Sequence, residues 1–280
     1  MEGIELFKDN CDVESTKTVI LHFCTRRSGS NAISNFIHNT YHHPKKMFHA
    51  DHDCFSNKFN DNLKYIMSPG VLHNNDREKN MNMVFLRFEG LFLNSINFNF
   101  DEYFKVWDML TGKYDKLICV LSLRDPFNTF ASIMKNKRIG KDFLRNKPKE
   151  LRLLRRKAML DKWKMHAREF LGDTNYLPSN KIFINYNKWF IDEGYRKDLV
   201  KKFGREDCGM EYNRVSTDGG GSSFSKNTIK DSTKMPLLDR WKYFKDHKNY
   251  KEIFKDEELH YLSNKIFGHI EGTEIFLKRG

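Results

Sequence analysis

The sequence predicts a three-layer α/β fold, in which a central, mostly parallel sheet is flanked by helices. Short apolar, β-branched runs recur along the chain, and the first of them, 18–23, is followed by an amphipathic stretch with helical spacing. A second run, 118–123, is followed by Asp125 and Pro126, a capping residue and a proline suited to the first turn of a helix. Strands that alternate with helices in this way are typical of a parallel sheet.

The bulk composition is that of a folded protein with an excess of basic residues. The chain has 280 residues, and 39% hydrophobic residues with 24 Phe and 4 Trp are enough for a sizeable core. We find no internal repeat and no domain boundary, so we expect one domain over 1–280 with its core at about 18–270. The net charge of +12 suits an anionic partner: nucleic acid, a phosphorylated cofactor, or a sulfated or carboxylated polymer. The alternative is a Lys- and Asn-heavy composition that reflects an AT-rich genome.

The cysteines and the N-terminal residues indicate the cellular compartment of the protein. The five cysteines are odd in number and never spaced Cys-x-x-Cys, which predicts neither a disulfide framework nor a zinc ribbon and favours a reducing compartment. The N-terminus lacks the form of a signal peptide, and no apolar run approaches the ~20 residues needed to span a bilayer. We therefore expect a soluble, cytoplasmic protein without a membrane partner.

The first predicted strand, 18–23, leads into a loop of small and basic residues: Arg26, Arg27, Ser28, Gly29, Ser30 and Asn31. The helix predicted to follow would present unpaired backbone N–H groups at its start, which is a ready cradle for phosphate. The usual nucleotide loop, Gly-x-x-x-x-Gly-Lys-Ser/Thr, is absent, because the loop has one glycine and no lysine. This argues against an ordinary ATPase or kinase.

A second candidate for anion binding follows the run 118–123. Arg124 comes where the strand ends, and Ser132, eight residues later, lies about two turns into the predicted helix. A guanidinium group offers a fork of donors that fits phosphate. The alternative is an ordinary strand–loop–helix junction whose arginine is solvated.

Two motifs together resemble those of the sulfotransferase superfamily, whose members use 3′-phosphoadenylyl sulfate (PAPS). One is Arg27-Ser28-Gly29-Ser30-Asn31 after the first strand, and the other is Arg124-Asp125-Pro126 with Ser132 after a later strand. The resemblance implies that the first loop holds the 5′-phosphosulfate and that Arg124 and Ser132 hold the 3′-phosphate. It implies transfer of a sulfuryl group to an acceptor hydroxyl or amine, with adenosine 3′,5′-bisphosphate as product and no metal. The acceptor stays open: a carbohydrate, a protein tyrosine or a small alcohol or amine. The chain departs from the cytosolic members at Asn31 and Ala32, where those have Thr and Trp.

A candidate general base ends the run 83–89, which closes with Arg87, Phe88 and Glu89. Ligands of open α/β sheets gather at the carboxyl ends of strands, where a carboxylate beside basic groups can accept a proton. The resemblance implies Glu89 as the base, with Arg27 and Arg87 stabilising charge on the leaving phosphate. A surface carboxylate paired with Arg87 is the alternative.

The segment 41–57 is rich in histidine and aspartate. These are metal-ligand types, but their spacing fits no standard site, so we expect no metal. We expect instead a loop that lines the acceptor cleft, with His49, Asp51 and His52 on the acceptor side. His49 and Asp51 are the rivals of Glu89 as base.

The second half of the chain supplies the remaining candidates. The run 181–186 predicts a strand that includes Tyr186, which the resemblance places against the adenine; a core tyrosine is the alternative. The glycine-rich tract 219–225 predicts a loop, where the resemblance assigns three further residues to the 3′-phosphate: Ser222, Ser223 and Lys226.

Helical spacing marks three further segments, one in the middle of the chain and two near its end. The basic stretch 138–171 predicts a helix whose packed face would comprise Leu151, Leu154, Ala158, Trp163, Ala167 and Phe170. Its charged face is either solvated or a docking surface for an acidic acceptor or nucleic acid. The segments 237–244 and 256–267 predict closing helices, the second capped by Gly268.

These observations predict a PAPS-dependent sulfotransferase. Two alternatives from other classes stay open: a nucleotide kinase with a degenerate P-loop, and a non-enzymatic, basic nucleic-acid binder that uses the Arg/Lys helix. Magnesium-dependent ATP turnover would favour the first. Oligonucleotide binding with a steep salt dependence would favour the second, which we do not expect.

Overall fold

The computed structural model describes residues 18–41, 47–53, 83–90, 92–93, 115–136, 149–177, 180–206, 224, 229 and 231–277. Its strands are β1 (Thr18–Cys24), β2 (Met47–Asp53), β3 (Met83–Glu89), β4 (Lys116–Leu123) and β5 (Lys181–Asn185). They form one sheet in the order β2-β3-β1-β4-β5, and every strand pairing in this sheet is parallel. The predicted α/β class with a parallel sheet is confirmed.

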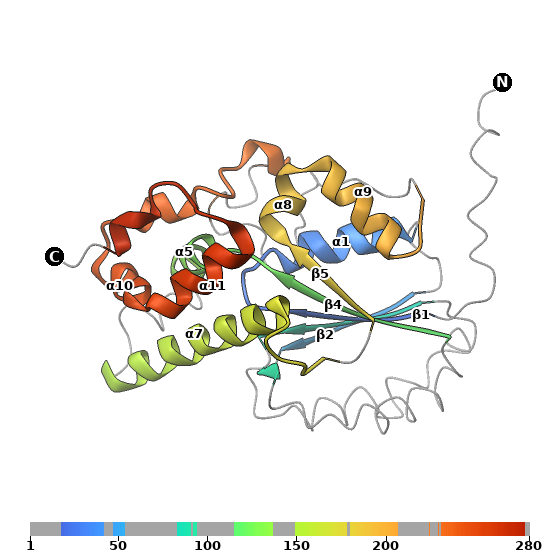
Figure 1. Ribbon diagram of the computed structural model, residues 1–280, viewed down its shortest axis with the longest axis horizontal. Coiled ribbons are helices and arrows are strands. Elements are labelled where there is room, and N and C mark those ends of the chain that lie inside the picture. Colours follow the sequence, from blue (N-terminus) through green and yellow to red (C-terminus); the bar gives the residue numbers. More distant parts are fainter. Residues whose placement is uncertain are drawn as a thin grey trace.

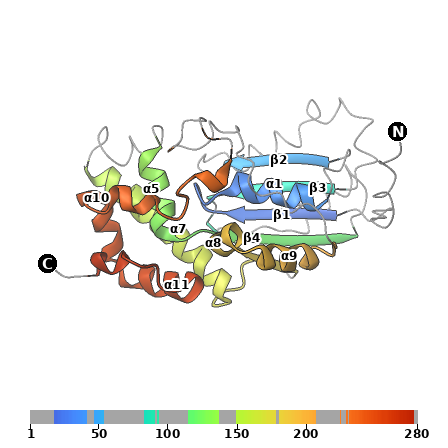
Figure 2. The same ribbon diagram turned by 90° about the horizontal axis from the view of Figure 1, so that it is seen from above.

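Helices cover both faces of the sheet (Figure 1). One face carries α1 (Ser30–Thr40), α8 (Tyr186–Ile191) and α9 (Glu193–Lys202), and α7 (Lys149–Leu171) covers the other. Beyond the carboxyl ends of the strands lie α5 (Pro126–Lys135), α10 (Lys248–Lys251) and α11 (Glu257–Phe267) (Figure 2). Four short 3₁₀ helices complete the described part of the chain: η4 (Ser232–Lys234), η5 (Arg240–Phe244), η6 (Glu252–Lys255) and η7 (Thr273–Phe276).

The described core consists of two clusters of buried hydrophobic residues. One cluster packs alternate strand residues such as Ile20 and Val120 against α1, α8 and α9, with Trp189 among its buried members. The other joins α5, α7 and the C-terminal helices around Phe127 and Trp163, and it includes Leu123 at the end of β4. The loops that follow the strands therefore have packed helices on either side.

The predicted start of α5 and the predicted end of α11 are confirmed. The carboxylate of Asp125 accepts a hydrogen bond from the backbone N–H of Asn128, and Pro126 is the first residue of α5. Gly268 ends α11 with φ 74°, in the region that favours glycine.

None of the helices in the described part of the chain has the length and apolar character needed to cross a membrane.

Three predicted elements differ from the structure. Residues 47–53, expected in a loop, form the edge strand β2, because their backbone pairs in register with all of β3. The strand expected over 181–186 ends at Asn185, whose side chain caps the next helix by accepting a hydrogen bond from the backbone N–H of Lys188. The helix expected over 237–244 is the 3₁₀ helix η5, which begins only at Arg240.

The packed face predicted for α7 is wrong in its first half. Leu151 and Leu154 are 37% and 64% exposed, whereas Trp163 and Ala167 are buried. Figure 1 shows the reason: the N-terminal end of α7 lies far from the sheet, and its C-terminal half lies beside the strands. Helical spacing alone does not show where a helix leaves its neighbours.

A buried carboxylate fastens the chain between α7 and β5. Glu169 is fully buried and accepts hydrogen bonds from Lys181 Nζ at 2.7 Å and Thr174 Oγ1 at 2.7 Å. It also accepts from the backbone N–H groups of Tyr176 and Leu177. Burial alone would raise the pKa of Glu169, but these donors outweigh it and hold the pKa below the ordinary value of 4.5.

Glu169→Gln is expected to lower the free energy of unfolding at pH 7 by roughly 2–3 kcal/mol, because an amide cannot accept from all four donors. Since the folded-state pKa is depressed, the stability that this carboxylate supplies is complete above pH 4.5 and is lost as the pH falls through the lowered value. Urea unfolding at pH 7 and at pH 4 measures both effects, and the two proteins should differ less at pH 4. Glu193→Gln, at an exposed ion pair with Lys197, is the control and should change little. An equal loss for Glu169→Gln at both pH values would contradict this account.

Candidate functional site

The loop after β1 is a tight turn that directs the chain into α1. The backbone N–H of Ser28 donates to the carbonyl of Thr25, and the Ser28 hydroxyl donates to the same oxygen at 2.6 Å. Arg27 and Gly29 take left-handed conformations, with φ 62° and 87°. The start of α1 therefore lies at the carboxyl end of the sheet, while the Ser28 hydroxyl is used inside the loop.

Tyr186 closes this turn from the opposite side. It is the first residue of α8, and its ring packs so closely on Gly29 that a Cβ atom there would lie 2.1 Å from Tyr186 Cε2. Only glycine fits at this position. The guanidinium carbon of Arg124 lies 5.1 Å from the centre of the same ring. The ends of β1, β4 and β5 thus meet at one tyrosine.

Three arginines gather beside this tyrosine. The hydroxyl oxygen of Ser132 accepts from Arg27 Nε at 3.3 Å and from Arg240 Nη1 at 3.4 Å. Arg124 donates to the carbonyls of Arg27, at 3.5 Å, and Leu237. Arg124 and Arg240 are only 1% and 6% exposed. We call Arg27, Arg124, Arg240 and Ser132 the arginine cluster.

Charge repulsion and burial make this cluster electrostatically unfavourable by itself. Burial lowers the pKa of Arg240 to about 9, and repulsion from Arg124 and Arg27 adds to the effect of burial. Burial also lowers the pKa of Arg27, where attraction to Glu89 acts in the opposite direction. An anion bound among the three guanidinium groups would offset this cost.

Three members of the cluster, Arg27, Arg124 and Ser132, were predicted from the sequence, but Arg240 was missed. Arg240 has no motif around it, because its position depends on contacts distant in sequence. Asn128 Nδ2 donates to the carbonyl of Leu238, and the backbone N–H of Trp241 donates to Asn128 Oδ1 at 3.3 Å. These bonds fasten the start of η5 to α5, which brings Arg240 to Ser132.

Glu89 and Arg87 both hold the first turns of α1. The Ser30 hydroxyl donates to Glu89 Oε1 at 2.8 Å. Arg87 Nη1 donates to Asn31 Oδ1 and to Ser34 Oγ, the latter at 3.4 Å. The end of β3 therefore fixes the position of the helix start. Glu89 lies beside the loop, at the carboxyl end of its strand.

Other predicted residues lie outside the described part of the chain. This is true of Ser222, Ser223 and Lys226, although their neighbour Phe224 lies with its ring centre 4.9 Å from the guanidinium carbon of Arg240. For His49, Asp51 and His52 only the strand register is described, opposite Phe85, Arg87 and Phe88. Within the described residues, no group of three or more His, Cys, Asp or Glu side chains could hold a metal ion.

Comparison with known proteins adds no identification. No family model, no curated protein and no solved structure matches the chain. Function is therefore inferred from the geometry of the arginine cluster and of the loop before α1.

Proposed function

We propose that this protein is a sulfotransferase that moves a sulfuryl group from PAPS to an acceptor hydroxyl or amine. The observation that carries the proposal is the arginine cluster at the carboxyl end of a parallel sheet. In it the Ser132 hydroxyl accepts from Arg27 and Arg240, and buried Arg124 donates to the carbonyl of Arg27. A doubly phosphorylated nucleotide supplies anions at two points. The cluster and the adjoining helix start offer two matching sites.

The two anionic ends of the nucleotide would divide between these sites. The 3′-phosphate suits Arg124, Arg240 and Ser132, because all three are buried. Arg124 is held by the carbonyl of Leu237, and Ser132 lies in α5, where its hydroxyl accepts from Arg240. The start of α1 suits the 5′-phosphosulfate, because the first N–H groups of a helix attract anions. Arg27 lies between the two sites, since it contacts Ser132 and is attracted to Glu89.

The proposed reaction is an in-line displacement at sulfur. The acceptor oxygen forms a bond to sulfur, the bond from sulfur to the bridging phosphate oxygen breaks, and the acceptor proton passes to Glu89. The products are the sulfated acceptor and adenosine 3′,5′-bisphosphate. Arg27 would stabilise the charge that develops on the bridging oxygen. Arg87, bonded to Asn31 and Ser34, would hold α1 in place.

Calorimetric titration tests the nucleotide site. We expect adenosine 3′,5′-bisphosphate to bind with a micromolar Kd and to bind at least ~10-fold tighter than AMP, which lacks the 3′-phosphate. ATP with magnesium is the comparison for a kinase, and a mixed oligonucleotide at two salt concentrations is the comparison for a nucleic-acid binder. Tighter binding of either one than of adenosine 3′,5′-bisphosphate would contradict the proposal.

Glu89→Gln tests the base. We expect turnover of PAPS with the best acceptor from a panel of sugars and small alcohols to fall by roughly 100- to 10,000-fold, because the amide cannot take the proton. Affinity for adenosine 3′,5′-bisphosphate should change little. Glu193→Gln, which makes the same change at an exposed carboxylate paired with Lys197, is the control and should leave turnover unchanged. Unchanged turnover in Glu89→Gln would assign the base to another residue.

A further inference from the structure

Three buried polar side chains form a connected set between the sheet and α1: His22 in β1, Ser122 in β4 and Ser34 in α1. His22 and Ser122 are fully buried, and Ser34 is 2% exposed. The Nε2 atom of His22 lies 2.7 Å from Ser122 Oγ, and its Nδ1 atom lies 3.3 Å from Ser34 Oγ. The imidazole ring therefore joins two strands to the helix that covers them.

The direction of these hydrogen bonds follows from Arg87. A guanidinium group can only donate, so Ser34 Oγ accepts from Arg87 Nη1 at 3.4 Å. The Ser34 hydrogen is then available for His22 Nδ1, while the proton on Nε2 is donated to Ser122. A neutral imidazole satisfies all of these contacts. The connected set thus extends from β4 across β1 to α1, and through Arg87 to β3.

The two bonds of His22 have different consequences. The strands β1 and β4 are already joined by their backbone ladder, in which His22 is paired with Val120. The bond to Ser122 therefore adds little to the placement of the strands and instead orients the imidazole ring. The bond to Ser34 crosses from the sheet to the helix layer and holds α1 about one turn after its start.

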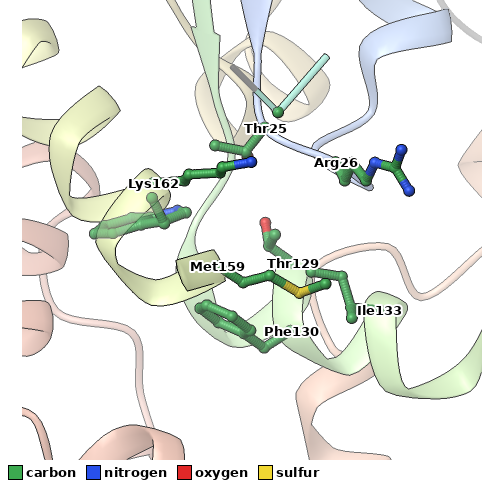
Figure 3. A pocket seen from close by; sticks show the side chains of 9 residues that line it. Thr25, Arg26, Thr129, Phe130, Ile133, Met159 and Lys162 are labelled. Carbon is green, nitrogen blue, oxygen red and sulfur yellow. The ribbon is translucent and has the colours of Figure 1, made fainter. Parts of the chain in front are cut away.

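The opposite flank of the loop gives α1 less support. There Thr25 and Arg26 face side chains of α5 and α7 across a small pocket (Figure 3). The pocket leaves space on this flank, whereas on the α1 flank Arg87 bonds to Asn31 and to Ser34. The position of the helix start therefore depends on side chains of β1 and β3.

We propose that His22 is a positioning residue of the candidate site, which holds the start of α1 through Ser34 while Ser122 fixes the orientation of its ring. Because β4 leads directly into Arg124, this arrangement sets the separation between the helix start and the arginine cluster. The effect of His22 on α1 is independent of any ligand, whereas its effect on nucleotide affinity rests on the proposed function.

His22→Asn and His22→Gln separate the two bonds. The Asn amide occupies the place of Nδ1 and keeps the contact with Ser34, whereas the Gln amide reaches the place of Nε2 and keeps the contact with Ser122. Amide hydrogen exchange, followed by NMR on the full chain without ligand, reports on the first turn of α1, where the N–H groups of Ala32 and Ile33 donate to the carbonyl of Gly29. We expect His22→Gln to speed the exchange of these two amides at least ~10-fold, and His22→Asn to change it by less than ~3-fold.

Calorimetric titration measures the consequence for the proposed nucleotide site. We expect adenosine 3′,5′-bisphosphate to bind His22→Gln at least ~10-fold more weakly than it binds the unaltered protein, and to bind His22→Asn within ~3-fold of it. Adenosine 3′-monophosphate, which would engage only the arginine cluster, should bind all three proteins alike. A general loss of stability would not distinguish these two ligands.

His260→Asn is the matched control, because His260 is also buried and its Nε2 donates to the carbonyl of Phe254 in the C-terminal region. It should lower the melting temperature and leave exchange in α1 unchanged. Ser34→Ala removes the same bond from the helix side and should match His22→Gln, which keeps the proposal testable if a His22 variant does not fold.

Equal exchange rates in folded His22→Asn and His22→Gln overturn the proposal, whatever the nucleotide does. If the rates differ as expected but the unaltered protein does not bind adenosine 3′,5′-bisphosphate, His22 still holds α1 and the proposed function fails. If the nucleotide binds the unaltered protein and both variants with equal affinity, the nucleotide site stands and His22 has no part in positioning it.

Discussion

Arg124→Ala is expected to abolish measurable binding of adenosine 3′,5′-bisphosphate, with a loss of at least ~100-fold in affinity. A hydrogen bond to a charged group contributes about 1.5–3 kcal/mol, and a guanidinium group can make two such bonds to one phosphate. Two bonds of this strength correspond to a factor of roughly 100 or more in Kd. Arg124 is 1% exposed, so water cannot replace it fully.

Stability must be separated from binding in this experiment, because Arg124 also donates to the carbonyls of Arg27 and Leu237. Arg196 is a matched control: it is 3% exposed and its Nη1 donates to the carbonyls of Trp189 and Phe190, away from the arginine cluster. Arg196→Ala should lower the melting temperature while nucleotide affinity is retained. Equal losses of affinity in both variants would show that Arg124 acts only through folding.

Arg240 provides an independent check on the same site. Because burial and its neighbours lower its pKa, a bound anion should stabilise the folded protein by relieving the repulsion. We expect saturating adenosine 3′,5′-bisphosphate to raise the melting temperature of the unaltered protein and to raise that of Arg240→Gln much less. Differential scanning calorimetry measures both shifts. Equal shifts would remove Arg240 from the site.

The sequence was sufficient to predict the parts of this fold that have local causes. The strands around Ile20 and Val120 are apolar on both faces, which is the pattern of a buried parallel sheet. Asp125 and Pro126 carry the chemistry of a helix start, and α5 begins there. Likewise, Gly29 lies between a strand and a helix in the sequence as it does in the structure.

The parts that were missed depend on contacts between distant residues. Arg240 reaches Ser132 only because Asn128 fastens the start of η5 to α5, and no short-range pattern encodes that contact. Leu154 has helical spacing relative to Trp163, but nothing in the spacing shows that its end of α7 lies far from the sheet. The strand β2 was missed for a similar reason, since edge strands depend on the neighbour with which they pair.

Gly29→Ala is expected to have the largest effect on stability, a loss of about 3 kcal/mol or more in the free energy of unfolding. Two costs add at this position. The backbone has φ 87°, where an L side chain is strained, and the new Cβ would lie 2.1 Å from the Tyr186 ring. The ring cannot move aside easily, because it is buried between Gly29 and Arg124.

Gly172→Ala separates the two costs, because Gly172 has φ 82° and a Cβ atom added there would meet nothing within 4 Å beyond its chain neighbours. Its loss should be only about 1 kcal/mol, the cost of the left-handed backbone alone. Chemical denaturation of both variants gives the difference, which measures the contact between Gly29 and Tyr186. Tyr186→Ala in the Gly29→Ala background should recover part of the loss, as expected for two residues in contact. If Gly29→Ala costs no more than Gly172→Ala, the ring does not pack on the loop, and the meeting of β1, β4 and β5 at Tyr186 cannot be what shapes the proposed nucleotide site.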